Sequence, residues 1–125
     1  MRQIVTARAG LLVALAGASA VLLGAFGAHA LRGVLDPQAR ELWQTAVNYH
    51  VWHALALALA VGLGRGRSGR VSMAGFAIGI VLFSGSLYAM ALGAPHWVGI
   101  ITPFGGVAFI VGWIALGWTL RYRHI

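Results

Sequence analysis

The sequence predicts an all-α integral membrane protein, an antiparallel bundle of four transmembrane helices. First, 60% of the 125 residues are hydrophobic and only 9% are charged, whereas about a quarter of a soluble domain is charged. Second, the hydrophobic residues form four long segments, at residues 9–31, 42–64, 71–93 and 98–120. Third, the charged residues lie between these segments. This composition excludes a disordered chain, and the length predicts one membrane domain over residues 1–125.

Each segment has the length of a transmembrane helix, because about twenty residues at 1.5 Å per residue cross the ~30 Å hydrocarbon layer. None has Asp, Glu, Lys or Arg in its interior. In lipid, every backbone amide needs a partner within the protein, so segments of this length are expected to be helices.

The first segment also has features of a secretory signal peptide. Arg2 and Arg8 precede an apolar run, and Ala28-His29-Ala30 follows the A-x-A pattern of a cleavage site. The run is longer than the usual hydrophobic region of about 7 to 15 residues. We therefore expect a retained helix.

Two connections carry local signals. Before the second segment, Asp36 is placed to cap a helix and Pro37 to occupy its first position, which predicts a short amphipathic lead-in from Pro37 to Leu42. Between the second and third segments, residues 65–70 contain three Arg and two Gly. We expect this stretch to form a tight, flexible loop.

The arginines predict the orientation. With four spans, the termini and the middle loop share one side, which holds seven of the nine Arg and neither acid. On the other side, Arg32 and Arg40 are offset by Asp36 and Glu41. The positive-inside rule places both termini in the cytoplasm, with the chain in a bacterial inner membrane. The net charge of +7 then predicts contact with anionic lipid at the cytoplasmic face. It does not predict nucleic-acid binding, which needs one basic, water-facing surface.

Small residues recur at helical spacing and predict close helix packing. The first segment has Ala or Gly at positions 16, 20, 24 and 28, and the third has the GxxxG pair Gly75 and Gly79. A helix face lined by small residues can pack against another helix of the same bundle. It can instead contact a second copy of the chain or a larger membrane complex. The sequence leaves both alternatives open.

Polar residues inside the spans are the best functional signal, because polar groups in lipid are costly. Counted from the outer ends, they lie in the outer half or near the middle of the bilayer. His53 is about 16 Å past Leu42 at 1.5 Å per residue, so we expect both its ring and that of His50 to be neutral. The candidate polar cluster consists of His29, Gln44, Asn48, Tyr49, His50, His53, Ser84, Ser86, Tyr88 and Thr102.

Three interpretations of this cluster compete. The favoured one is that the polar residues hold the helices together by hydrogen bonds, which makes the chain a non-enzymatic structural or accessory component. The alternative is an outward-facing polar pocket for a small molecule, lipid or ion. The least favoured is a metal or haem iron held by His29, His50 and His53, since no carboxylate or thiol is nearby to complete the site. We predict no cofactor and no catalytic residue, because no acid is placed to orient a histidine.

Four stretches together resemble the DUF 423 family, small bacterial membrane proteins of unknown function with mitochondrial relatives in animals. They are GAFGAH at 24–29, QT at 44–45 with Tyr49 and HVWHALA at 50–56, LFSGSLY at 82–88 and ITPFGG at 101–106. The resemblance extends over about residues 9–118 and implies a bundle of four spans. It implies no activity.

The family's motif positions match this sequence at Gly24, Phe26, Gly27, His29, Tyr49, His53, Ser84, Gly85, Ser86, Tyr88, Pro103, Gly105 and Gly106. His50 matches less closely, because family members can carry another polar residue there. The resemblance therefore favours His29 and His53 over an obligate pair of His50 and His53.

Overall fold

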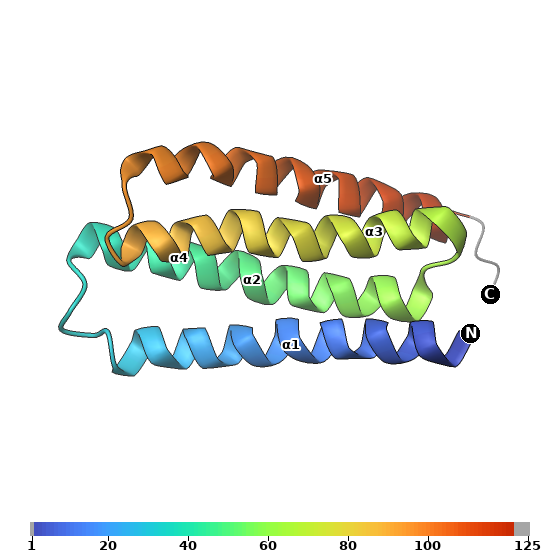
Figure 1. The fold of residues 1–125 in the computed structure, drawn as a ribbon, viewed down its shortest axis with the longest axis horizontal. Coiled ribbons are helices and arrows are strands. Elements are labelled where there is room, and N and C mark those ends of the chain that lie inside the picture. Colours follow the sequence, from blue (N-terminus) through green and yellow to red (C-terminus); the bar gives the residue numbers. More distant parts are fainter. Residues whose placement is uncertain (1, 122–125) are drawn as a thin grey trace.

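The computed structural model describes residues 2–121, with side chains from residue 7 onward. Within these residues, four helical stretches are long and apolar enough to cross a membrane, which confirms the predicted all-α membrane bundle (Figure 1). The elements in chain order are α1 (Arg2–His29), α2 (Pro37–Leu63), α3 (Gly66–Gly79), the π-helical η1 (Ile80–Ser84), α4 (Gly85–Ala91), the 3-10 helix η2 (His96–Ile100) and α5 (Ile101–Leu120). The third stretch comprises α3, η1 and α4, and the fourth comprises η2 and α5.

The four stretches run antiparallel, so the first and last described helices have their outer termini at the same end of the bundle. The start of α1, the α2–α3 connection and the end of α5 lie together there (Figure 1). The arginines at positions 8, 65, 67, 70 and 121 belong to this arginine-rich end. Arg123, on which the predicted orientation also drew, lies outside the described residues.

The second helix begins earlier than its apolar segment. The Asp36 carboxylate accepts a hydrogen bond from the Ala39 backbone N–H at 2.8 Å, and Pro37 occupies the first turn. This cap satisfies an N–H that would otherwise lack a partner. The predicted lead-in from Pro37 to Leu42 is therefore continuous with the span.

The prediction of a loop over residues 65–70 is wrong. Only Gly64 and Arg65 separate α2 from α3, and the helix begins at Gly66, whose φ is +60°. Glycine adopts this left-handed conformation without a steric penalty, so the chain reverses within two residues. The arginines at 67 and 70 are thus on the first turns of a helix.

The third span contains a local change of helix type that the sequence did not predict. In η1, the Gly85 N–H donates to the carbonyl of Ile80, five residues earlier. Ser84, the last residue of η1, is completely buried in the bundle. Its hydroxyl donates to the Ala46 carbonyl of α2 at 2.8 Å. Single-turn π-helical segments of this kind occur within longer helices, often at functional sites.

The GxxxG pair packs α3 against α5. A Cβ atom on Gly75 would lie 2.8 Å from the Ala108 carbonyl oxygen and 2.9 Å from the Gly112 Cα, both in α5. A Cβ atom on Gly79 would overlap the Phe109 ring. These glycines therefore serve contacts within the chain, one of the two alternatives left open by the sequence.

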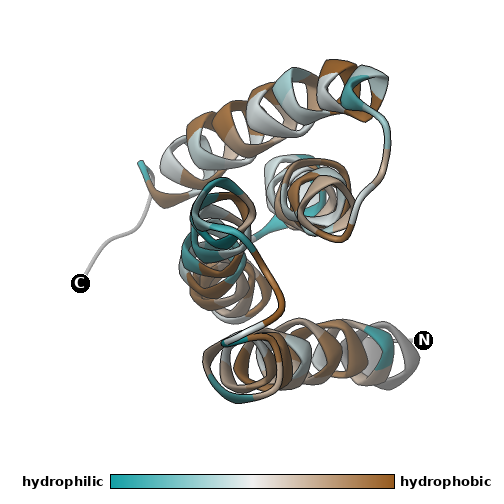
Figure 2. Ribbon diagram, turned by 90° about the vertical axis from the view of Figure 1, so that its left-hand side faces the viewer, coloured by the Kyte–Doolittle hydropathy of each residue, from teal (hydrophilic) through white to brown (hydrophobic). Residues whose placement is uncertain are grey.

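The core lies among three helices, and α1 lies beside it. The largest group of buried apolar residues comes from α2, α3 and α5: Ala56, Leu57, Ala60, Phe76, Phe109 and Leu116. Helix α1 lies along α2, away from α5 (Figure 2). Trp43 of α2 anchors it by donating its indole N–H to the Leu23 carbonyl at 3.0 Å. Much of α1, including Leu15 and Val21, is consequently exposed on the outside of the bundle.

Candidate functional site

The polar residues of α2 point to two different neighbours. His50 and His53 are three residues apart and therefore about 60° apart around the helix axis. Both are buried, but His50 faces α1 and α4 whereas His53 faces α5. The two histidines of the predicted cluster thus belong to separate groups.

His53 lies in an aromatic cage. Its ring stacks on Phe109 with 3.5 Å between centroids, and the Phe76 and Tyr49 rings each lie 5.9 Å away. Its Nδ1 is 2.7 Å from the Tyr49 carbonyl oxygen, and its Nε2 is 3.1 Å from the Trp113 indole nitrogen. A carbonyl can only accept and an indole N–H can only donate. His53 is therefore neutral, with its proton on Nδ1 and no ring nitrogen left for a ligand.

His50 is the centre of a hydrogen-bond series across three helices. Its Nε2 is 3.0 Å from the Ser19 hydroxyl of α1, and its Nδ1 is 2.9 Å from the Tyr88 hydroxyl of α4. The Ser19 hydroxyl donates to the Ala16 carbonyl at 3.1 Å. Ser19 must then accept a hydrogen bond from the His50 Nε2–H, and the Tyr88 hydroxyl must donate one to Nδ1. All three side-chain donors are used in this way.

The serine and threonine hydroxyls of the predicted cluster are also paired inside the bundle. Ser86 donates to the Phe83 carbonyl at 2.9 Å and shares a second hydrogen bond with the Thr102 hydroxyl of α5. Ser84 pairs with the backbone of α2, as described above. Among the described residues, no buried side-chain nitrogen or oxygen lacks a hydrogen-bond partner. These groups stabilise helix contacts, because an unpaired polar atom in lipid would be costly.

Three predicted residues lie away from these groups. His29 is exposed at the last residue of α1, ten residues along the helix from Ser19. The Gln44 amide donates to the Asn48 carbonyl oxygen at 2.8 Å, in an exposed pair on α2. His29 and His53 therefore do not form the pair favoured by the resemblance. Over residues 2–121, no three His, Asp or Glu side chains are grouped to share a metal ion.

Three residues that the sequence did not single out are important in the structure. Ser19 and Trp113 complete the environments of the two histidines. Ser72 is fully buried and donates to the Gly112 carbonyl at 3.0 Å, linking α3 to α5. A hydroxyl side chain within an apolar segment is a sequence signal that could have identified Ser19 and Ser72. No sequence signal pairs Trp113 with His53, because they are 60 residues apart.

His50 and Tyr88 also line a groove between α1 and the third span. Its volume is about 450 Å³, and most of its walls are apolar, including Leu12, Leu15 and Ile80. The groove is therefore not the polar pocket that the alternative interpretation requires. It is a surface suited to hydrocarbon, with one hydrogen-bond series along its wall.

Comparisons with known proteins agree on a membrane protein. Residues 23–106 match the family model described as "Protein of unknown function (DUF423)". The chain is 46% identical over 101 residues to UPF0382 membrane protein YwdK of Bacillus subtilis, covering 78% of this chain and 82% of the relative. It is also 46% identical over 109 residues to a UPF0382 membrane protein of Haemophilus influenzae, covering 86% and 88%. No solved structure matches the chain significantly.

Proposed function

The chain belongs to the DUF423 family of membrane proteins, and from this premise we propose that it is a non-enzymatic structural or accessory component of the bacterial inner membrane. The observation that carries the proposal is the complete pairing of buried polar side chains within the described residues. Polar groups that bind or transform a substrate need donors or acceptors that are still available. Here the buried ones are engaged inside the bundle.

The arrangement of the hydroxyls and histidines argues against nucleophilic catalysis. Ser84 donates to a backbone carbonyl and Ser86 is paired with Thr102, so neither hydroxyl is activated by His53. The His53 ring is oriented by a carbonyl and an indole rather than by a carboxylate. A serine–histidine mechanism requires a nucleophile that donates a hydrogen bond to its base. Ser19 contacts His50, but its hydroxyl donates to the Ala16 carbonyl.

Metal and haem content tests this proposal. Protein purified in mild detergent is expected to hold substoichiometric zinc, iron and copper and to lack a haem absorption band. The physical reason is that His50 and His53 use both ring nitrogens within the protein. Elemental analysis and an absorption spectrum are the measurements. One equivalent of metal in the native chain, absent from a His53→Ala variant, would contradict the proposal.

We also propose that the arginine-rich end lies in the cytoplasm. The reasons are the positive-inside rule and the position of the two acidic side chains, Asp36 and Glu41, at the opposite end of α2. Contact of the arginines with anionic lipid of the inner leaflet would reinforce this orientation.

Single-cysteine labelling tests the orientation, because the sequence contains no cysteine. In intact cells, a membrane-impermeant maleimide is expected to label Gln38→Cys, at the start of α2, but not Ser68→Cys, at the start of α3. Both should react after lysis, which controls for access to the thiol. Labelling of only Ser68→Cys in intact cells would reverse the orientation.

A further inference from the structure

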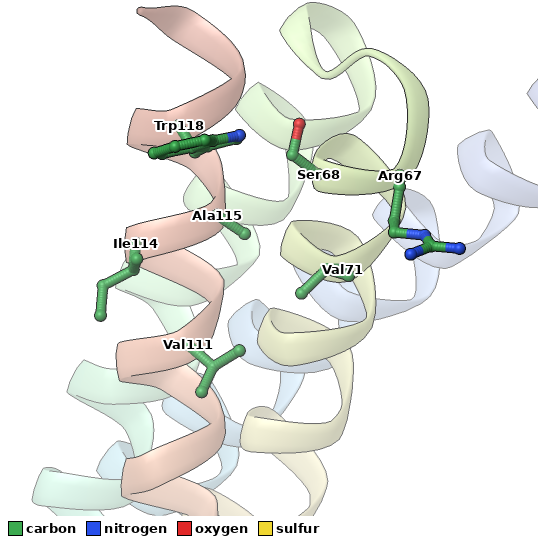
Figure 3. Close-up of a pocket in the computed structure, with 7 residues that line it drawn as sticks. All are labelled: Arg67, Ser68, Val71, Val111, Ile114, Ala115 and Trp118. Carbon is green, nitrogen blue, oxygen red and sulfur yellow. The ribbon is translucent and has the colours of Figure 1, made fainter.

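A cleft opens on the outer surface of the bundle, between the first turns of α3 and the last turns of α5. Its volume is about 560 Å³. Figure 3 shows Val71 of α3 facing α5 across the cleft, with Trp118 nearer the arginine-rich end. The lining residues of α5 are Val111, Ile114, Ala115 and Trp118, which share one helix face over about 10 Å at 1.5 Å per residue. Since Ile114 is 67% exposed and Trp118 58% exposed, this face is turned toward lipid.

The cleft is apolar along its length and polar at one end. Val71, Val111 and Ile114 supply hydrocarbon walls. At the mouth of the cleft, which is at the arginine-rich end, the Ser68 hydroxyl lies beside Trp118 (Figure 3) and donates to the Arg65 carbonyl at 3.2 Å. The Arg67 guanidinium points away from α5 in the same view. Because this side chain is exposed, its long stem can turn toward a group held at the mouth. The gradient matches a molecule with an apolar chain and a polar head.

The positive charge at the mouth favours a negatively charged head group. Arg65, Arg67 and Arg70 are all exposed at the start of α3. The Arg121 guanidinium carbon lies 3.4 Å from the centroid of the Trp118 ring, which adds another positive charge. The two side-chain carboxylates of the chain, at positions 36 and 41, are at the other end of the bundle. An anionic head is therefore attracted to this end and a zwitterionic one much less.

We propose that the α3–α5 cleft binds an anionic phospholipid, with one acyl chain along Val71, Val111 and Ile114 and the phosphate held by the Arg67 guanidinium at the mouth. The proposal deepens the proposed function, on which it rests for the membrane location of the chain. It assigns a defined site to lipid contact, whereas charge alone would give diffuse attraction around the whole arginine-rich end.

The first test compares two arginines by native mass spectrometry in detergent. The probes are dioleoyl phosphatidylglycerol and dioleoyl phosphatidylcholine, which differ in head group but not in acyl chains. Phosphatidylglycerol is expected to bind more tightly, and Arg67→Gln to weaken its binding about fivefold. The matched control is Arg8→Gln, which removes the same charge from an exposed position at the same end, on α1 and away from the cleft. Equal loss in both variants would mean diffuse attraction and would overturn the site.

The second test fills the cleft. Val111→Trp places a large side chain between the cleft walls, whereas Ile110→Trp places it on the neighbouring exposed face of α5. Only Val111→Trp is expected to abolish binding of the first phosphatidylglycerol, with helix content by circular dichroism unchanged in both. Unaltered binding in Val111→Trp would overturn the proposal. A detergent micelle has no cytoplasmic or outer face, so these binding results do not depend on the orientation of the chain in the membrane. They also do not depend on its metal content.

Discussion

Replacing His53 by alanine is expected to destabilise the bundle by about 3 kcal/mol, the range found when a buried ring is removed from a core. Two losses add together. The Phe109 ring, 3.5 Å from the His53 ring by centroids, would face a cavity that its packed neighbours cannot fill. The Trp113 indole N–H would lose its acceptor, and an unpaired donor in an apolar surrounding is costly. Unfolding in mixed micelles titrated with SDS measures the difference.

His29→Ala is the matched control for this substitution. His29 is exposed at the end of α1, so its removal is expected to change the free energy of unfolding by less than about 0.5 kcal/mol. Equal destabilisation by the two variants would show that His53 has no special part in the core. Because both variants remove an imidazole, any general effect of histidine loss cancels in the comparison.

Gly105→Ala is expected to destabilise the contact between α5 and the third span by about 1–3 kcal/mol, the usual cost of overpacking. A Cβ atom on Gly105 would lie 2.7 Å from the Cα atom of Phe83 and closer still to its backbone nitrogen. Backbone atoms inside a helix cannot move aside as the end of a flexible side chain can. The helices must therefore separate, which also strains the adjacent hydrogen bond between Ser86 and Thr102. The same SDS titration measures this loss.

The neighbouring glycine provides the control. A Cβ atom on Gly106 would meet only the Phe83 ring, at 4.0 Å, which is an ordinary contact distance. Gly106→Ala is expected to leave the free energy of unfolding unchanged or to raise it by up to about 1 kcal/mol, since alanine favours a helix over glycine. A Gly105→Ala protein as stable as Gly106→Ala would refute the close approach of the two helices.

Much of the fold could be predicted because the membrane restricts the choices. Four apolar segments without internal charge can only be helices in lipid, and short connections make successive helices antiparallel. The family was predicted from four motifs and is confirmed by the match over residues 23–106. The boundaries were less predictable. Asp36 and Pro37 extend α2 beyond its apolar segment, and Gly66 starts α3 within what composition indicated was a loop.

The candidate site was predicted as a set of residues, but its arrangement was not. Spacing along α2 places His50 and His53 near one another, yet only the positions of α1, α4 and α5 decide what each ring meets. Ser19 and Tyr88 contact one histidine and Trp113 the other. These partners are far away in the sequence, so no local pattern reveals them.

The helical membrane class of this chain, with arginines gathered at one end, follows from composition and charge position alone. Composition and charge position act through the membrane environment, and their effect does not depend on how the helices pack. Only the packed bundle shows that Gly75 serves α5, that α1 lies outside the three-helix core, and that the buried polar atoms of the described residues are paired. Those outcomes depend on how closely two backbones approach and which side chains meet between them, and that geometry arises only when the helices pack together.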